Sequence, residues 1–344
     1  MRRRTLCLLP ALALAGGALT SLRRPTITAP SLRGPARALD RPAMGTIWQV
    51  VLPADAPPHA DRVASQALDE VSRLEDVLSE FRPHTEVSRI NAAAGVDSVV
   101  VSEDTWRVTE RALHYARLSD GAFDPTWAAL RSVWSFRDGS SVPSPALVRE
   151  RASLVDWTAV EMDRTRRAVG LRRRGMAIGF GGIAKGYALD RMRAILLAES
   201  VRDFVLYSGG QVLAEGTRDG RPWRVGVQHP RRSEELVATL SVTGRSVSTG
   251  GDYEHCFIRD GRRYHHVLDP RTGWPVEHTS SVTVVSDSAL DADALDTALF
   301  VLSPDRARTL ATALGAAVLR VDPGMQLELS DPMRSLLAPR GARA

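Results

Sequence analysis

Cysteine is scarce in this sequence, which has only Cys7 and Cys256 among its 344 residues. Cys7 lies inside an apolar run near the N-terminus, and no Leu-x-x-Cys box ends that run, so a lipoprotein is not expected. If the run is removed, Cys256 remains alone and the mature chain has no internal disulfide, even though disulfides persist in exported proteins. We expect Cys256, in a strand-like segment, to be a small buried hydrophobic residue rather than a nucleophile.

The sequence also lacks an apolar run long enough to cross a membrane at its start. The run from Leu6 to Leu19 has about fourteen residues, against the roughly 20 that a spanning helix needs. It follows three arginines, Arg2 to Arg4, which is typical of an export signal, and Ala13-Leu-Ala15 fits a cleavage site. We therefore assign residues 1–24 to a Sec or twin-arginine signal with an uncertain cleavage site and expect a periplasmic protein. The alternative is an uncleaved anchor.

An excess of positive charge is absent once this leader is set aside. Residues 1–24 contain five arginines and no acid, so their removal brings the formal net charge from +5 to zero. The basic composition therefore belongs to the targeting segment and does not indicate nucleic-acid binding.

The rest of the chain reads as one α+β domain with no internal repeat. Residues 25–41 are predicted to be a linker, 42–335 the domain and 336–344 a tail. Apolar periodicity predicts helices over about 60–81, 104–118 and 187–199, and a helical stretch around Asp291 to Thr297. Strands are predicted at 46–52 and, after the third helix, at 204–208, 211–217, 223–228, 236–242, 246–248 and 256–259. Strands clustered after helices favour mixed, largely antiparallel sheets with flanking helices over a doubly wound sheet.

A glycine-rich segment, residues 179–186 (GFGGIAKG), formally satisfies the dinucleotide-binding pattern G-x-G-x-x-G/A. Glu199 follows at the spacing expected of a ribose-binding acid. The segment lies in the middle of the chain rather than at the start of a βαβ unit, so this evidence for a Rossmann dehydrogenase is weak. Two interpretations remain: a turn that lets the backbone approach a ligand while Lys185 faces phosphate, or a packing turn with a surface lysine.

Two neighbouring histidines, His265 and His266, are the histidines that suggest chemistry. A neutral imidazole could accept a proton from an attacking hydroxyl. Because successive side chains on a strand point to opposite faces, at most one of the two can face a given site. The following residues, Asp269 to Gly273, predict a tight turn in which Gly273 is free to take a positive φ.

An oxygen-rich segment, Asp291 to Thr297, follows shortly afterwards. Asp293 and Thr297 are four residues apart, so on a helix their oxygens share one face. One carboxylate and one hydroxyl suit Mg²⁺ when phosphates and waters complete its octahedron. The alternative is that these acids only complement the helix dipole in a first turn.

Taken together, these segments resemble the ApbE family, the FAD:protein FMN transferases, from about Ala43 to Leu302. The resemblance rests on blocks in the family's order: Met44-Gly-Thr46, Leu78 to Phe81, Ser88 to Asn91, Gly121 to Pro125, Gly181 to Tyr187, Ser208 to Gly210, Ser248 to Tyr253, His266 to Gly273 and Asp293 to Thr297.

The resemblance implies an ApbE/T-fold-like structure and a Mg²⁺-dependent enzyme. Such an enzyme splits FAD, links FMN to a threonine or serine of a partner flavoprotein and releases AMP. It implies that Asp293, Thr297 and the backbone of Gly182 hold Mg²⁺ and that His266 is the base. It assigns the FAD site to Met44, Phe81, Ala122, Phe123, Asp124, Lys185, Val267 and Asp296. The family's acceptors belong to Rnf-type, sodium-pumping Nqr-type and nitrous-oxide-reduction systems, so any membrane contact would come through the acceptor or an uncleaved leader.

Three positions depart from the family's pattern. Phe81 stands where the family often has tyrosine, Gly179 where it often has an acid, and Gly250 where serine is common. None is a proposed metal ligand, so activity is expected to survive, although Gly179 puts one FAD contact in doubt. Two other functions stay open: Mg²⁺-dependent hydrolysis of FAD to FMN and AMP, and FAD binding or electron transfer without cleavage.

Overall fold

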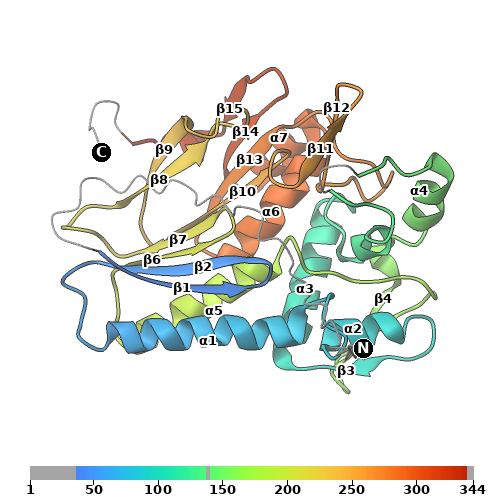
Figure 1. The fold of residues 1–344 in the computed structure, drawn as a ribbon, viewed down its shortest axis with the longest axis horizontal. Helices are drawn as coiled ribbons and strands as arrows, with labels where there is room; N and C mark the ends of the chain where they lie inside the picture. Colours follow the sequence, from blue (N-terminus) through green and yellow to red (C-terminus); the bar gives the residue numbers. More distant parts are fainter. Residues whose placement is uncertain (1–35, 137–139, 339–344) are drawn as a thin grey trace, which may run out of the picture.

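An antiparallel sheet forms the middle layer of the fold (Figure 1). The computed structural model describes residues 36–136 and 140–338, so the predicted export signal lies outside the described residues. Within them the largest sheet has eight strands in the order β1-β2-β6-β7-β10-β13-β14-β15. These are Arg37–Ala43, Thr46–Leu52, Phe204–Ser208, Gln211–Glu215, Arg245–Gly251, Ser281–Ser286, Ala317–Val321 and Leu327–Leu329.

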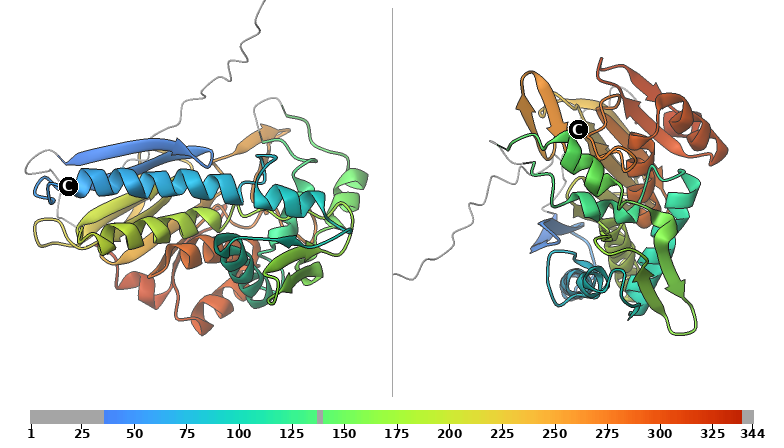
Figure 2. Two further views of the ribbon diagram at one scale, coloured as in Figure 1. Left: turned by 90° about the horizontal axis from the view of Figure 1, so that it is seen from below. Right: turned by 90° about the vertical axis from the view of Figure 1, so that its right-hand side faces the viewer.

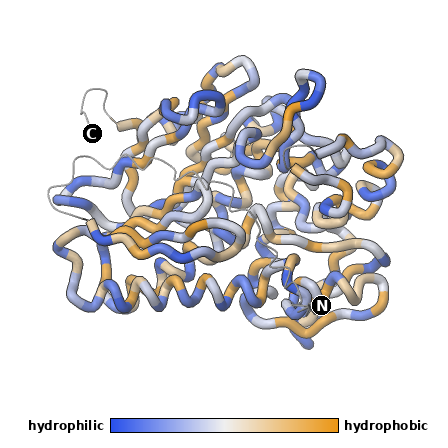
Figure 3. The backbone as a smooth tube through the Cα atoms, in the orientation of Figure 1, coloured by the Kyte–Doolittle hydropathy of each residue, from blue (hydrophilic) through white to orange (hydrophobic). Residues whose placement is uncertain are grey.

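Three helices cover one face of this sheet (Figure 2): α1 (Ala60–Leu78), α5 (Ala184–Ala198) and α6 (Ala289–Val301). The predicted apolar stripe of α1 is buried from Val63 to Leu78, while its other positions are polar, which Figure 3 shows as alternating colours along the helix. The helix ends at Ser79, whose ψ of 129° is extended. Trp48 and Val50 of β2 are fully buried beneath this layer, so burial of this face is the main contribution to the core.

The opposite face of the sheet is covered by the hairpin of β8 (Trp223–Gln228) and β9 (Leu236–Val242) and by α8 (Asp331–Arg334). Alternate strand residues serve the two faces, as a period of two requires. In β6, for example, Leu206 packs under the helices and Val205 packs under the hairpin.

The remaining elements pack around these layers. They are α2 (Glu86–Ala92), α3 (Glu103–Leu118), the 3₁₀ turns η1 (Pro125–Leu130) and η2 (Trp157–Ala159), α4 (Pro145–Ala152), α7 (Pro304–Ala313), the sheet of β3 (Val99–Val100), β5 (Ala168–Leu171) and β4 (Val160–Asp163), and the hairpin of β11 (Cys256–Arg259) and β12 (Arg262–His265).

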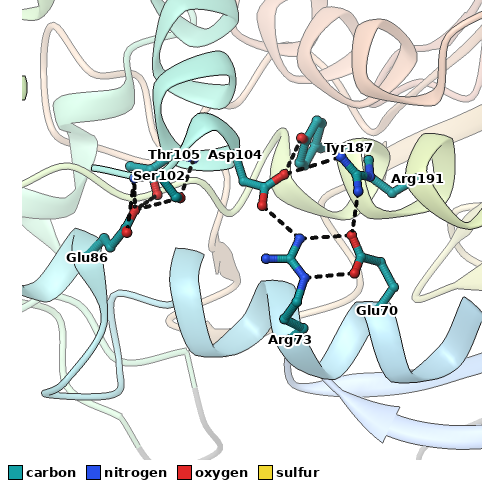
Figure 4. A network of polar contacts seen from close by, with 8 residues as sticks. All are labelled: Glu70, Arg73, Glu86, Ser102, Asp104, Thr105, Tyr187 and Arg191. Carbon is teal, nitrogen blue, oxygen red and sulfur yellow. Dashed lines mark hydrogen bonds and ion pairs between the residues drawn. The ribbon is translucent and has the colours of Figure 1, made fainter. Parts of the chain in front are cut away.

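A network of charged side chains ties α5 to α1 and α3 (Figure 4). Arg73 of α1 bridges Glu70 and Asp104, each at 2.7 Å, and the hydroxyl of Tyr187 on α5 donates to Asp104 at 2.6 Å. Burial alone would raise the pKa of Asp104, but the bonds from Tyr187 and Arg73 outweigh it and hold that pKa below its usual range. The network therefore fixes the first turns of α5, where Lys185 lies.

The predicted fold class is confirmed, because helices flank sheets whose named strand pairs are all antiparallel. The first strands, β1 and β2, are antiparallel, which contradicts the Rossmann interpretation of the glycine segment. The strand β1 begins at Arg37, inside the predicted linker, because Arg37 and Arg41 reach Asp61 and Asp69 of α1 and so allow a charged edge strand.

Other boundaries moved by a few residues. The helix α5 begins at Ala184 rather than near 187, and β10 is longer than the strand predicted at 246–248. The start of the predicted tail is tied to the hairpin by a bridge between Leu240 and Leu337. Cys256 is half-buried and accepts a hydrogen bond from Arg263 at 2.9 Å rather than being fully buried. In the part of the chain that the structure describes, no helix has the length and apolar character to cross a membrane.

Candidate active site

The helices α5 and α6 meet closely enough to share hydrogen bonds. Asp190 of α5 caps α6, since its carboxylate accepts from the amides of Ala289 at 2.8 Å and Leu290 at 3.0 Å. A Cβ at Gly186 would lie 2.2 Å from the carbonyl oxygen of Ala289, so only glycine fits there. The amide of Gly186 donates to Oδ2 of Asp293 at 3.0 Å. Close packing therefore carries the α6 acids to the start of α5.

Two carboxylates of α6 are buried side by side. Asp293 is 5% exposed and Asp296 is 3% exposed. Burial raises the pKa of Asp293, against the opposing charge of Lys185 and the Gly186 amide. Burial and the nearby charge of Asp293 together raise the pKa of Asp296 well above its usual range. Paired buried carboxylates are costly unless a cation joins them.

The oxygen atoms of Asp293, Asp296 and Thr297 fit a divalent cation of the Mg²⁺ type. The hydroxyl of Thr297 donates to Oδ1 of Asp296 at 3.1 Å and to the carbonyl of Asp293 at 3.3 Å. A Cβ at Gly182 would lie 2.9 Å from the Thr297 hydroxyl, so glycine leaves the backbone open to it. Within the residues that the structure describes, no group of three or more acidic, histidine or cysteine side chains could hold a metal ion. Such a sparse oxygen set suits a cation that also binds substrate phosphate.

One positive charge lies among these acids. Lys185 is the single lysine in the sequence, and its ammonium donates to the carbonyl of Gly181 at 2.8 Å. Its charge favours the ionised forms of Asp293 and Asp296 and disfavours protonation of His266. The predicted metal residues, lysine and histidine therefore belong to one electrostatic cluster.

The two histidines have different surroundings. His265 is buried, and both ring nitrogens are used: Nε2 meets the carbonyl of Val276 at 2.7 Å and Nδ1 accepts from the amide of Val267 at 3.3 Å. In His266, Nδ1 is buried and has no partner. Burial, followed by the nearby His255 and His265, lowers the pKa of His266 to about 3. Its imidazole is therefore neutral near pH 7.

The residues assigned to the FAD site differ in their exposure. Phe81 is 74% exposed, with the guanidinium of Arg131 stacked 4.7 Å from its ring centre. Phe123 and Ala122 are buried, and the Phe123 ring lies 3.4 Å from where a Cβ of Gly182 would be. Asp296 touches Ser248 and lies beside Gly250 of β10. Phe123 therefore lies against the cluster at Gly182, and Asp296 belongs to the cluster itself.

The other predicted contacts are less direct. Met44 has a φ of 47° in the β1–β2 turn and packs, partly buried, against the main hydrophobic core. Val267 is bonded through its backbone to His265 and Val276. The carboxylate of Asp124 accepts two bonds from Thr126 and one from the amide of Trp157, so most of its roughly four acceptor positions are used within the protein.

A surface hollow of about 440 Å³ lies elsewhere, between α3 and β4. Arg111, His114 and Arg164 line it, and none of the predicted site residues does. We do not assign the site to it, because the buried acids and the neutral imidazole are the groups that chemistry needs.

Sequence reasoning missed the residues that hold the site together. Asp190 and Gly186 both follow Lys185 closely in the sequence, but their partners lie on α6, which is distant in the chain. A glycine directly before a predicted helix was the available signal, because it can indicate close packing by another element.

Comparisons with known proteins agree with this arrangement. The model of the ApbE family matches residues 44–319. An FAD:protein FMN transferase of Klebsiella pneumoniae (strain 342) is 34% identical over 293 residues, covering 82% of this chain and 89% of that protein. One of Treponema pallidum (strain Nichols) is 35% identical over 298 residues, covering 80% of each chain.

Solved structures give the same relationship. The ApbE protein of Thermotoga maritima superposes with a TM-score of 0.82 and 33% identity, covering 89% of this chain and all of that one. The apo form of the Pseudomonas stutzeri flavinyl transferase ApbE has a TM-score of 0.77 and 30% identity, covering 89% and 98%. This chain therefore belongs to the ApbE family.

Proposed function

We propose that this protein transfers FMN from FAD to a hydroxyl group of a partner protein. The observation that carries the proposal is the cluster of buried Asp293 and Asp296, the single lysine Lys185 and the unpartnered Nδ1 of His266. A pyrophosphate brings negative charge and needs both a cation site and a lysine, while an attacking hydroxyl needs a neutral base. The names of the relatives support the same reaction.

The reaction is a displacement at the FMN phosphorus. The acceptor, a threonine or serine, gives its hydroxyl proton to His266 as its oxygen bonds to that phosphorus. The bond between this phosphorus and the bridging oxygen breaks, and AMP leaves with that oxygen. Asp293, Thr297 and the backbone of Gly182 would hold Mg²⁺, which when bound supplies positive charge to the phosphates. Lys185 orients the diphosphate, and the exposed ring of Phe81 offers a flat surface to a planar ring.

Location and partners extend this proposal. The apolar run behind three arginines supports export to the periplasm. The acceptor would then be a periplasm-facing flavoprotein domain of the Rnf, Nqr or nitrous-oxide-reduction type. The protein would meet a membrane only through that acceptor or an uncleaved leader, and the absence of excess charge after the leader gives no support to nucleic acid as a partner.

The test is mass spectrometry of a threonine-containing acceptor domain incubated with the protein, FAD and Mg²⁺. We expect a mass gain equal to one FMN on the threonine, with an equal amount of AMP. Free FMN and AMP without an adduct, across all three acceptor types, would support the hydrolase instead. Intact FAD after long incubation would leave a binding protein, and either result would contradict the proposal.

A further inference from the structure

Glu80 is a buried carboxylate with no part in the reaction as described so far. It is 9% exposed and lies between α1 and α2, directly before the exposed Phe81. The loop around it is held from both sides. The hydroxyl of Thr85 donates to the carbonyl of Ser79 at 2.6 Å, and Arg131 donates to the carbonyl of Glu80 at 2.9 Å. The loop therefore directs residue 80 inward and residue 81 outward.

The carboxylate of Glu80 occupies the space that a side chain at position 179 would need. A Cβ built on Gly179 would lie 2.9 Å from Oε1 of Glu80 and 3.1 Å from Cβ of Ala128. The φ of Gly179 is not in the left-handed region, so its conformation does not require glycine. The requirement is space for Glu80.

The backbone at Gly179 cannot move aside to make room. Its amide donates to the carbonyl of Pro125 at 2.9 Å, and its carbonyl accepts from the indole of Trp127 at 3.2 Å. The residue before it, Ile178, is bonded at both its amide and its carbonyl by the side chain of Asn91. Positions 80 and 179 are therefore a spatial pair.

The protein does not fully satisfy this carboxylate. Burial raises its pKa, while its own amide, the amide of Phe180 and the charges of Arg131 and Lys185 oppose that rise. In the described part of the chain no side chain donates a hydrogen bond to it, although a carboxylate has about four acceptor positions. An acid this deeply buried is costly without further donors.

We infer that Glu80 is a binding residue of the FAD site, whose carboxylate accepts a hydrogen bond from an N–H or O–H group of the dinucleotide. This inference rests on the proposed function. Lys185 links Glu80 to the cluster electrostatically, and Phe81 beside it presents an exposed ring on which Arg131 stacks. A flat aromatic surface next to a buried acid fits a planar heterocycle and its polar substituents. Glu80 then supplies, from a position adjacent in space, the acid that the family often has where this chain has Gly179.

The first experiment compares FAD binding by the wild-type protein and Glu80→Gln, which keeps the shape and removes the charge. Binding is measured by quenching of flavin fluorescence, without Mg²⁺ or acceptor so that no transfer occurs, and the melting temperature of each apo-protein is recorded. We expect the Kd of Glu80→Gln to rise roughly 10- to 100-fold, the loss of one hydrogen bond to a charged group. The control is Glu215→Gln, which should bind FAD like the wild type. Glu215 of β7 is another shielded acid, and it pairs with Arg193 of α5.

The second experiment tests the pairing itself. Gly179→Asp alone places two carboxylates in one space and should lower both the melting temperature and FAD affinity. Glu80→Ala alone should lower affinity. The double variant Glu80→Ala/Gly179→Asp should recover affinity at least tenfold over either single variant, since an acid again faces the site.

The outcomes separate this inference from the proposed function. If Glu80→Gln binds FAD as tightly as the wild type, or changes only the melting temperature, Glu80 is a structural acid and the inference is wrong. A double variant that binds FAD no more tightly than the weaker-binding single variant would also overturn it. If the wild type binds FAD, Glu80→Gln does not, and no transfer occurs with any acceptor, the inference stands and the proposed function falls. If the wild type does not bind FAD, both fall.

Discussion

The main-chain amide of Gly186 on α5 donates a hydrogen bond of 3.0 Å to the carboxylate of Asp293 on α6. This bond joins the glycine-rich segment to the acid predicted to hold a metal, although more than a third of the domain separates them in sequence. Residue 186 is glycine for a separate reason, because any Cβ there would collide with the backbone of Ala289.

Gly186→Ala should therefore damage both stability and the site. We expect the free energy of unfolding to fall by about 3 kcal/mol, since the added methyl meets main-chain atoms that cannot turn away. Denaturant unfolding measures this loss. Gly324→Ala is the control, because its added Cβ would contact only the side chain of Asp322 and its φ is ordinary. If Gly186→Ala were as stable as the wild type, α5 and α6 could move apart at that point without a loss of stability.

Asp293→Asn should abolish most FMN transfer. The variant keeps the size of the side chain but removes the charge that would hold Mg²⁺, and a loss of several kcal/mol in transition-state stabilisation corresponds to a fall on the order of 10³-fold in kcat/KM. The rate of acceptor labelling is measured across a Mg²⁺ titration. Asp291→Asn on the same helix is the control, because Asp291 pairs with Arg111 instead. Equal rates in all three proteins would exclude Asp293 as a metal ligand.

His266→Gln should lower kcat by roughly 10²- to 10⁴-fold while FAD affinity changes little, as expected for loss of a general base. Burial and the neighbouring histidines hold the pKa of His266 at about 3. The base is therefore already neutral at pH 5, and the wild-type rate should show no histidine step between pH 5 and pH 8. Stopped assays over this range check it. A wild-type rate that halves near pH 6.5, with the step absent in the variant, would contradict a buried neutral imidazole.

Asp124→Asn should change how stability depends on pH. Burial raises the pKa of Asp124 to about 6, despite hydrogen bonds from Thr126 and Trp157. Because the folded pKa is raised, the stabilisation from this group is complete below its unfolded pKa and is lost as the pH rises through about 6.

The unfolding free energy of Asp124→Asn relative to the wild type should consequently increase by about 2–3 kcal/mol between pH 4 and pH 7. Urea titrations at each pH give this difference, and its slope is independent of any hydrogen bond lost equally at both pH values. A pH-independent difference would place the folded pKa of Asp124 near its ordinary value.

Lys185 can be followed chemically because it is the single lysine. An amine-acylating reagent can modify only this side chain and the N-terminus, so intact-mass analysis counts it directly. We expect FAD to slow acylation of Lys185 at least about tenfold, since a bound diphosphate would cover and pair with the ammonium. ADP-ribose without a flavin serves as the comparison ligand. Acylation at the same rate with and without saturating FAD would mean that Lys185 does not face the diphosphate.

The main features of the fold were predictable because they depend on local patterns. The stripe of α1 and the strand β2 repeat at helical and strand periods, and both are where the sequence predicts them. The edge strand β1 was missed because its charged residues resemble a linker, and its partners on α1 are not visible from the strand alone.

For the site, the sequence predicted which residue types matter but not how they are connected. The four-residue spacing of Asp293 and Thr297 does place both on α6, with the Thr297 hydroxyl beside Gly182 and the Asp293 carboxylate bonded to the amide of Gly186. The bond from the amide of Trp157 to Asp124, by contrast, and the close approach of Glu80 to Gly179 were not predicted. Such contacts join distant segments, so no local period or motif reveals them.

The strand order of the large sheet has a consequence for folding. The hairpin of β1 and β2 is hydrogen-bonded to β6, with Gln49 opposite Tyr207, and the helices α1 to α5 and the small sheet of β3, β5 and β4 lie between them in the chain. The sheet can close only after this long intervening stretch has been synthesised, and such non-local pairing is slow to form. We expect the chain to remain dependent on protection from aggregation until its second half is complete, because β2 otherwise exposes an unpaired, apolar edge.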